Sequence, residues 1–333
     1  MLAVFPRMRF LSKYGARRSL LLFAWLAWRT AVAAGPLFQT NDVVAFLGGA
    51  NVVAAQQSGQ LEALLTLAYP EHRLRFRSLA WEGDTVFAQP RELNFPSLTD
   101  QLAKIGATVI VFQFGQTEAR AGEAKRADFI QAYEQLLLAC ARQSPRLIVV
   151  IPPPFEATGD PLLPDLTRHN ADLGKYAASI RTLAAKHGAA VVDLSGKAVP
   201  AVPGSSGRLT RDGWHLTPAG QARVAASMAR QLGVEEATLR MAMPSVAEDR
   251  NGMPFEAIRQ KVIAKNRLWF QASRPTNWAF LGGDRTEQPS SHDHRDPKVR
   301  WFPTEMEEFG PLIATAENEI HELARKANNP SLR

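Results

Sequence analysis

The sequence predicts an α/β fold, a three-layer α/β/α sandwich in which about five parallel strands lie between two layers of helices. From Asp42 onward, apolar runs of strand length alternate with stretches of helical period, as in parallel sheets covered on both faces. With 333 residues, 46% of them hydrophobic, the chain has enough apolar material for one large core. The candidate strands cover residues 43–47, 74–79, 108–114, 147–151 and 190–194.

Two of the covering helices have a clear signature. Between the third and fourth strands, five apolar residues recur at helical spacing and mark one covering face: Phe129, Tyr133, Leu136, Leu137 and Cys140. Cys140 is the single cysteine, so it cannot form an internal disulfide and is predicted to be a small core residue. Residues 221–232 are predicted as the last covering helix, because Thr217 and Pro218 supply a cap and a first-turn proline.

The amino-acid composition of the chain changes after Glu235, and this change predicts a domain of residues 40–234 and a linker of residues 235–254. The linker is rich in methionine, proline and charge, and the β/α alternation does not resume after it. Residues 255–271 and 304–326 are predicted helices of a C-terminal extension, 255–327, that packs on the domain. The loop between them, 273–303, is unusually long for a compact region.

Residues 1–34 are predicted to be a secretory signal peptide, cleaved near Ala33 or Ala34. Basic residues precede a short apolar run at 20–28, which is too short for the roughly 20 residues of a stable membrane span. A retained N-terminal anchor is the alternative, because Arg29 interrupts the run. We therefore expect export to the periplasm or cell envelope, with no integral membrane span in the mature chain.

The high net charge of the chain resides in this leader, which has six basic residues and no acidic ones. Removal of the leader leaves 33 basic residues against 32 acidic ones. The nearly neutral mature chain gives no reason to expect binding to nucleic acid or to anionic lipid.

Ligands of open parallel sheets bind beyond the carboxyl ends of the strands, so the residues that follow each strand are candidates for a site. These segments are Gly-Gly-Ala-Asn at 48–51, Trp-Glu-Gly-Asp-Thr at 81–85, Gly-Gln-Thr-Glu at 115–118 and, before the last helix, Asp-Gly-Trp-His at 212–215. We refer to them as the first, second and third motifs and the Asp-His motif.

The order and spacing of these motifs resemble the SGNH or GDSL hydrolase superfamily over about residues 42–232. The most specific part is the Asp-His motif, which is followed by Leu-Thr-Pro-Ala-Gly at 216–220. The resemblance implies a flavodoxin-like sheet, an ester-hydrolase site and no cofactor. It also implies that Asp212 orients His215, which would act as general base; an imidazole exchanges protons near neutral pH and needs a carboxylate to fix its tautomer.

The chain departs from the family pattern at two positions. Ala50 stands where the family has its nucleophilic serine, and Thr117 stands where it has an asparagine that stabilises the oxyanion. Gly83 of the second motif remains, so its backbone N–H is a predicted oxyanion donor. Loss of a catalytic-triad member lowers rates by roughly 10⁴–10⁶ and loss of one oxyanion donor costs about 3 kcal/mol, which argues against serine-type turnover.

Three functions are compatible with these residues. In the first, the cleft is non-catalytic and binds a glycan or acylated sugar, with Asn51 and the indole faces of Trp81, Trp214 and Trp278 as contacts. In the second, the protein is an active ester hydrolase in which His215 activates water, or in which Thr85 or Thr117 replaces the serine. In the third, the domain is a scaffold for an envelope protein complex; the sequence identifies no protein partner.

The C-terminal extension resembles one found in exported SGNH-like proteins of planctomycete-type bacteria, through Lys-Asn-Arg-Leu-Trp-Phe at 265–270, Arg-Pro-Thr-Asn-Trp at 274–278 and Leu-Gly-Gly-Asp-Arg at 281–285. Its aromatic residues, Trp269 among them, are predicted to dock the two helices, with a lid over the cleft as the alternative. Arg274 and Arg285 would either clamp an acidic group or bond to loop carbonyls.

One polar stretch of the extension contains metal-binding residue types, His292, Asp293, His294 and Asp296. It has no matching partner motif elsewhere in the chain, so no metal site is predicted.

Overall fold

The computed structural model describes residues 36–91, 94–196, 199, 207–242, 254–287 and 292–329. The predicted leader, 1–34, and residues 243–253 of the predicted linker lie outside these ranges. Residues from Phe38 onward belong to one compact unit, which contains both the sheet and the C-terminal extension. None of the helices in the described part of the chain combines the length and apolar character needed to span a membrane.

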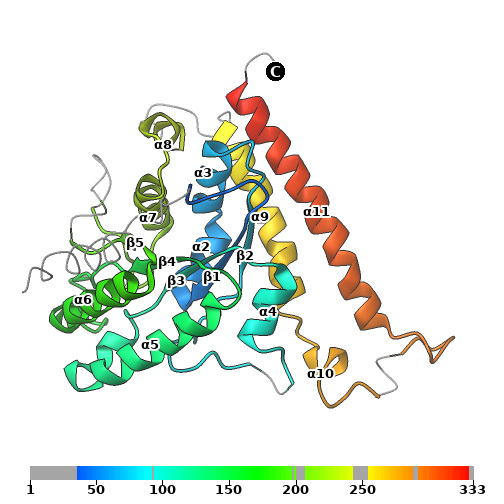
Figure 1. Cartoon of the computed structure of the whole chain (residues 1–333), viewed down its shortest axis with the longest axis horizontal. Helices are drawn as coiled ribbons and strands as arrows, with labels where there is room; N and C mark the ends of the chain where they lie inside the picture. Colours follow the sequence, from blue (N-terminus) through cyan, green and yellow to red (C-terminus); the bar gives the residue numbers. More distant parts are fainter. Residues whose placement is uncertain are drawn as a thin grey trace, which may run out of the picture. The chain divides into compact units, whose positions relative to one another are not determined.

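Five parallel strands form the central sheet in the order β2-β1-β3-β4-β5 (Figure 1), which confirms the predicted fold. This order is that of flavodoxin-like sheets, in which ligands bind where the strand order reverses, here between β1 and β3. Each strand begins and ends within one residue of its predicted limits. Strands β1, β3 and β4 are largely apolar because both of their faces are buried, whereas β2 alternates polar and apolar residues. The strands are β1 (Val43–Gly48), β2 (Arg75–Ser78), β3 (Val109–Gln113), β4 (Arg146–Ile151) and β5 (Ala190–Asp193).

Helices cover both faces of the sheet, as predicted. One face packs against α4 (Leu98–Ile105), α5 (Arg126–Ala141) and α6 (Asn170–His187), in a core centred on Phe112 and Tyr133. Cys140 of α5 lies in this core, and burial raises the pKa of its thiol to about 12. The other face packs against α2 (Ala50–Ser58), α3 (Gln60–Ala68) and α7 (Pro218–Gln231).

The start of α7 follows the predicted signal. Thr217 is the N-cap, and its hydroxyl oxygen accepts a hydrogen bond from the Gly220 amide at 3.0 Å. Pro218 occupies the first helical position, where its missing N–H costs nothing.

The predicted linker and long loop contain helices that the sequence analysis missed. Helix α8 (Glu236–Ala242) lies within the predicted linker, and its Leu239 is only 1% exposed. Helix α10 (Trp278–Leu281) lies within the loop predicted at 273–303. Both helices are too short for an apolar periodicity to identify them. The two long helices of the extension are confirmed as α9 (Pro254–Ser273) and α11 (Trp301–Asn328).

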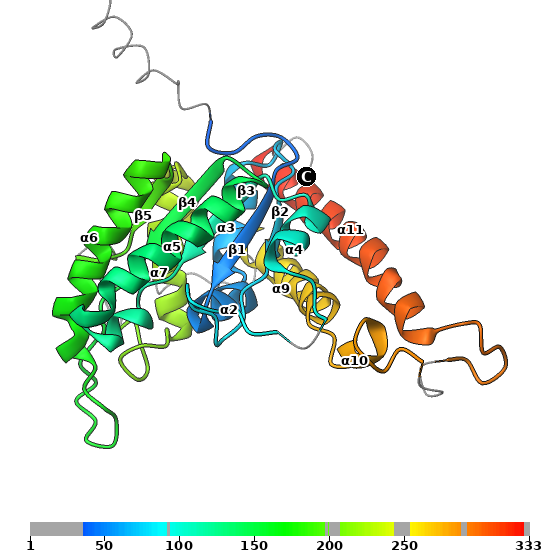
Figure 2. The same cartoon turned by 60° about the horizontal axis from the view of Figure 1, so that its bottom comes forward.

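The extension covers the open edge of the sheet, with α9 beside β2 and α11 packed against α9 (Figure 2). Among the described residues, strand β2 pairs with β1 alone. Alternate backbone carbonyls along β2 therefore point to the outer edge of the sheet, where they have no strand partner. Side chains of the extension donate to these carbonyls in register: His321 to Leu74 at 3.0 Å, Lys265 to Phe76 at 3.4 Å, Trp269 to Ser78 at 2.8 Å, and Arg274 to Ala80 just beyond the strand. We call these four donors the edge ladder.

Buried charge also joins the extension to the sheet domain. The Lys265 ammonium is fully buried and lies 2.7 Å from the Glu62 carboxylate of α3. Burial raises the pKa of Glu62, although Lys265 opposes this shift. Removal of one partner would leave the other buried without a counter-charge, so the pair ties α9 to α3 in one arrangement.

Candidate functional site

The first motif forms the turn between β1 and α2. Gly48 ends the strand where a Cβ atom would lie 2.5 Å from Val52 Cγ2 and 2.7 Å from the Gln113 carbonyl oxygen, so only glycine fits. Gly49 is the N-cap and Ala50 is the first residue of α2. The turn therefore presents the Ala50 side chain at the carboxyl end of the sheet.

A small cleft opens at this end of the sheet, beside the first motif. It encloses about 30 Å³, room for one or two water molecules. Four of the predicted site residues line it: Ala50, Asn51, Thr117 and Trp214.

Asp212 and His215 form the predicted pair. The Asp212 carboxylate lies 2.7 Å from His215 Nδ1 and also accepts the backbone amides of Trp214 at 3.0 Å and His215 at 2.7 Å. Burial acts to raise the pKa of Asp212, but these hydrogen bonds outweigh it and leave the pKa below its usual value. Asp212 is therefore ionised at neutral pH and fixes the imidazole through Nδ1.

The second ring nitrogen of His215 is available to a ligand. The His215 side chain is 34% exposed, and within the described ranges no hydroxyl lies within hydrogen-bond distance of Nε2. The imidazole therefore has the geometry of a general base but faces no nucleophile among those residues.

Trp214 links His215 to the cleft wall. The two rings stack with centroids 4.9 Å apart, and the Arg120 guanidinium lies 5.0 Å from the Trp214 ring centroid. His215 itself does not line the cleft, but it stacks on Trp214, which does.

Asn51 joins three of the motifs and is buried. Its amide nitrogen donates to Gln116 of the third motif at 3.2 Å and to the Trp214 carbonyl at 3.3 Å, and its oxygen accepts from the Leu216 amide at 3.4 Å. The sequence analysis predicted Asn51 as a ligand contact, and the structure shows that its polar atoms already bond to the protein.

The third motif contributes one exposed and one buried polar group. Thr117 is exposed, and its hydroxyl has no hydrogen-bond partner among the described residues. Glu118, which the sequence analysis did not single out, is buried and accepts the amides of Gly115 at 2.8 Å and Val86 at 2.9 Å. Burial raises the pKa of Glu118, although these amides oppose the shift. Glu118 thus ties the third motif to the segment after the second.

The second motif is a tight turn that lies against the first. The Asp84 amide donates to the Trp81 carbonyl at 3.0 Å, which places exposed Gly83 at the tip of the turn. A Cβ on Gly49 would lie 3.2 Å from the Asp84 carbonyl oxygen, so the two backbones are in close contact. Thr85, a predicted substitute nucleophile, does not line the cleft, and its hydroxyl contacts the Ala88 backbone in its own loop.

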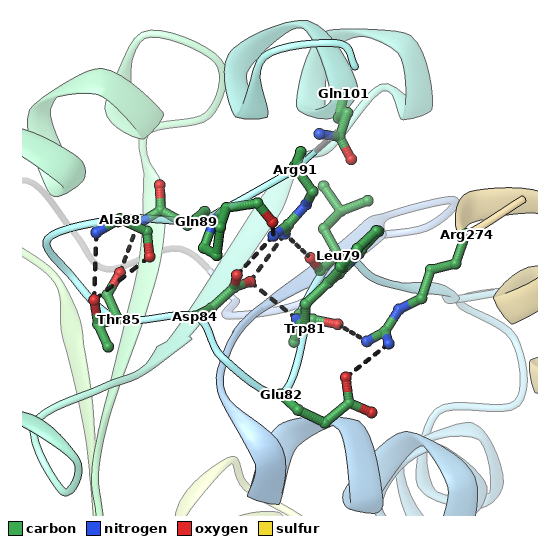
Figure 3. Close-up of polar contacts among 12 residues, drawn as sticks. Leu79, Trp81, Glu82, Asp84, Thr85, Ala88, Gln89, Arg91, Gln101 and Arg274 are labelled. Carbon is green, nitrogen blue, oxygen red and sulfur yellow. Dashed lines mark hydrogen bonds and ion pairs between the residues drawn. The ribbon is translucent and has the colours of Figure 1, made fainter. Parts of the chain in front are cut away.

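The tryptophans predicted to stack on a sugar are already covered in part by protein groups. Figure 3 shows Trp81 between two arginines, and the Arg91 and Arg274 guanidinium carbons lie 4.3 and 4.9 Å from its ring centroid. Trp278 packs on Phe95 with centroids 4.5 Å apart and does not line the cleft. Trp214 is the one of the three in the cleft wall.

The polar stretch at 292–296 is braced as a loop. Asp293 accepts hydrogen bonds from the Arg295 amide at 2.7 Å and from Trp301 Nε1 at 2.8 Å. The Arg295 amide and Trp301 lower the Asp293 pKa to about 2. Among the described residues, no group of three or more histidines, cysteines or carboxylates is arranged to hold a metal ion.

Comparison with known proteins gives a match to one family. The family model "GDSL-like Lipase/Acylhydrolase family" matches residues 49–223, or 175 of the 333 residues. This range contains all four motifs except Gly48. No curated protein matches the chain.

Several solved structures are similar to this chain. An acetylxylan esterase from Geobacillus stearothermophilus is 16% identical, with 60% of this chain and 97% of that chain covered and a TM-score of 0.44. A putative SGNH hydrolase from Slackia heliotrinireducens is 20% identical, with 58% and 100% covered and a TM-score of 0.45. A gut microbial diltiazem-metabolizing enzyme is 10% identical, with 86% and 96% covered and a TM-score of 0.54. The last of these shares the fold over more of the chain than the matched family range.

Proposed function

The chain belongs to the GDSL-like lipase/acylhydrolase family, and we propose that it is a degenerate ester hydrolase whose cleft binds an acylated sugar or a related glycan ester without cleaving it. The observation that supports this is the placement of Ala50 at the first position of α2, in the cleft wall. A methyl group has no lone pair with which to attack an ester carbonyl. The His215–Asp212 pair would then polarise or hold a ligand instead of activating a serine.

The size of the cleft supports a small acyl group as its occupant. The enclosed part of the cleft, about 30 Å³, is small, so only a short group such as acetyl would reach into it. The sugar would then lie at the rim, beside Trp214 and the exposed Arg120, where an indole ring and a guanidinium meet a polar ligand.

The experiment compares hydrolysis of a chromogenic acetyl ester by the purified wild type and by Ala50→Ser. We expect no enzymatic turnover in the wild type. The substitution restores a hydroxyl to an otherwise assembled site, so the rate should rise by at least about 10²-fold even with Thr117 at the asparagine position. Addition of His215→Ala to the Ala50→Ser protein should abolish that gain, because the base is then missing.

Ligand binding is tested on the wild type. Isothermal titration with an acetylated xylo-oligosaccharide should detect binding that is lost in Trp214→Ala and that is weaker for the deacetylated sugar. Binding that ignores both the acetyl group and Trp214 would contradict the proposed ligand.

The alternative function is that of an active hydrolase with a different nucleophile. It is favoured by the open second nitrogen of His215 and by the unpartnered hydroxyl of Thr117 at the cleft. Turnover by the wild type that disappears in His215→Ala would establish this alternative; persistence in Thr117→Val would identify water as the nucleophile. If neither His215 nor Trp214 affects any measured property, the scaffold function remains.

We also propose that the protein is exported by its leader. Five basic residues followed by the apolar run at 20–28 and by small residues at 31–34 support this. N-terminal sequencing of protein recovered from the cell envelope should find Ala34 or Gly35 as the first residue. Recovery of a chain that still begins at Met1 would contradict cleavage.

A further inference from the structure

We propose that Arg274, at the end of α9, is a positioning residue that holds the second-motif turn of residues 81–84 against the first motif. The extension is then a working part of the site, in addition to covering the edge of the sheet. This inference rests on the proposed function only where it gives the Gly83 N–H a role as oxyanion donor.

Arg274 makes three kinds of contact with the turn, and its side chain is only 12% exposed. One arm of the guanidinium donates to the Ala80 carbonyl, and the other donates to the Glu82 carboxylate at 2.9 Å. The plane of the group stacks on Trp81, with the guanidinium carbon 4.9 Å from the ring centroid. A forked planar cation makes all three contacts at once, which a lysine cannot do.

Arg91 makes the matching contacts from within the second-motif loop (Figure 3). It donates to both Asp84 carboxylate oxygens, at 2.7 and 2.9 Å, and to the Leu79 carbonyl at 3.1 Å. Asp84 in turn accepts the Trp81 amide at 2.9 Å. Trp81 is therefore held between two guanidinium groups, each of which also bonds to the backbone that leads into the turn.

These contacts converge on the backbone around Gly83. Glu82 is held by Arg274 and Asp84 by Arg91, so the residues on both sides of the exposed glycine are fixed. The carbonyl oxygens of the same two residues lie against Gly49, 3.5 and 3.2 Å from where its Cβ would be. Movement of the turn would thus change the distance between the Gly83 N–H and Ala50, the next residue of the first motif.

The position of Arg274 in the edge ladder explains why this residue can act on the site. His321 donates to Leu74, just before β2, and Lys265 and Trp269 donate to carbonyls of β2 itself. Arg274 donates to Ala80, beyond the end of the strand. Docking of the extension therefore continues past the sheet edge into the turn.

The test compares two arginine variants of the extension by hydrogen exchange of the purified protein. Arg259 of α9 is the matched control, because it also bonds to one backbone carbonyl, that of Ser58 at 2.8 Å, and to one glutamate, Glu256 at 2.6 Å. Arg274→Ala should speed exchange of the Trp81 and Asp84 amides by about tenfold, the scale of one lost charge-assisted bond. Arg259→Ala should leave these two amides within about twofold of the wild type, since its bonds lie on α2 and α9.

Arg274→Lys separates positioning from docking and remains available if Arg274→Ala does not fold. It keeps the positive charge beside Glu82 but loses the planar fork, so exchange at Trp81 and Asp84 should still rise, by a smaller factor than in Arg274→Ala. The proposal would be overturned if the Trp81 and Asp84 amides exchanged at the same rate in Arg274→Lys and in the wild type. It would also be overturned if Arg274→Ala and Arg259→Ala raised the exchange rates of these amides by the same factor.

A kinetic readout in the Ala50→Ser protein tests the link to the oxyanion. There, Arg274→Ala should lower kcat by about tenfold with KM little changed, while Arg259→Ala should change neither. An unchanged kcat in Arg274→Ala would overturn the oxyanion role of the positioned turn. If Ala50→Ser itself shows no esterase activity, the proposed function fails, and the exchange experiment still decides whether Arg274 positions the turn.

Discussion

At the scale of single residues, Ala50 and Thr117 occupy the two positions at which the chain departs from the family pattern. Ala50 has the strand-turn-helix setting that a nucleophile needs, and Asp212 and His215 are already paired. The sequence was sufficient to predict the Asp212–His215 pair and the place of Ala50 after the first strand, because both depend on local spacing. The catalytic roles of these residues stay predictions.

Other contacts between single residues could not be predicted from the sequence. Trp81 and Arg274 are 193 positions apart, and nothing in their neighbours indicates that one stacks on the other. Arg274 was predicted either to clamp an acidic group or to bond to loop carbonyls. In the structure it bonds to the Ala80 carbonyl and also forms an ion pair with Glu82. Asn51 was expected at the ligand because it follows Ala50, but helix geometry turns its side chain toward Gln116 and Trp214.

Asn51→Ala should destabilise the protein by about 2–3 kcal/mol, because it removes hydrogen bonds from three partners, buried Gln116 and the half-buried backbones of Trp214 and Leu216. Urea denaturation followed by tryptophan fluorescence measures the change. Gln57→Ala on the exposed face of α2 is the control and should change the stability by less than about 0.5 kcal/mol. A similar loss in both variants would mean that Asn51 acts only through helix propensity.

At the scale of elements, prediction succeeded where periodicity was long and failed where it was short. The five strands were predicted from runs of strand length, and helices α5, α7, α9 and α11 are long enough to be recognised from their apolar residues or caps. Helices α8 and α10 are one to two turns long, and their ends depend on packing against other elements. The edge ladder could not be predicted either. Its acceptors are backbone carbonyls, which every residue has, so the sequence does not indicate which of them are bonded.

The contact between α11 and β2 should depend on pH through His321. Burial lowers the pKa of His321 below its usual 6.5, helped by Arg73 and Lys265 and opposed by the Leu74 carbonyl and Glu317. As pH falls below about 6.5 the unfolded chain takes up this proton first, so the free energy of unfolding decreases until the lower folded-state pKa is reached.

The measurement is urea denaturation of the wild type and of His321→Gln at pH 7.5 and 5.5. Glutamine can still donate to the Leu74 carbonyl but does not titrate, so the stability difference between the two proteins should shift toward the variant at pH 5.5. If the difference in free energy of unfolding between the two proteins is the same at both pH values, the pKa of His321 does not differ between the folded and unfolded states.

At the scale of the whole molecule, the C-terminal extension and the sheet domain form one unit. The sequence analysis separated them by a linker, but Leu239 of α8 is buried in that segment, and α9 supplies fully buried Lys265 to α3. Composition changes at Glu235, yet composition carries no information about which surfaces the later helices cover. The family match ends at residue 223, so the extension lies outside the matched range although it packs on the sheet domain.

Removal of residues 243–333 should therefore prevent folding to a soluble monomer. The truncation exposes the outer carbonyls of β2 and the apolar surface of α3 that α9 and α11 cover, and exposed sheet edges promote association. Size-exclusion chromatography with light scattering should show aggregates. A monodisperse truncated protein with a cooperative unfolding transition would show that the sheet domain folds without the extension.

The central claim is that Ala50 occupies the nucleophile position of the site, where His215 would activate a serine. Intact-mass measurement after treatment with a fluorophosphonate probe tests it most directly, because the probe bonds only to an activated nucleophile and needs no knowledge of the substrate. We predict no mass increase for the wild type and one adduct for Ala50→Ser, located at position 50 and lost when His215→Ala is added. An adduct on the wild type, or none on Ala50→Ser, would contradict the account.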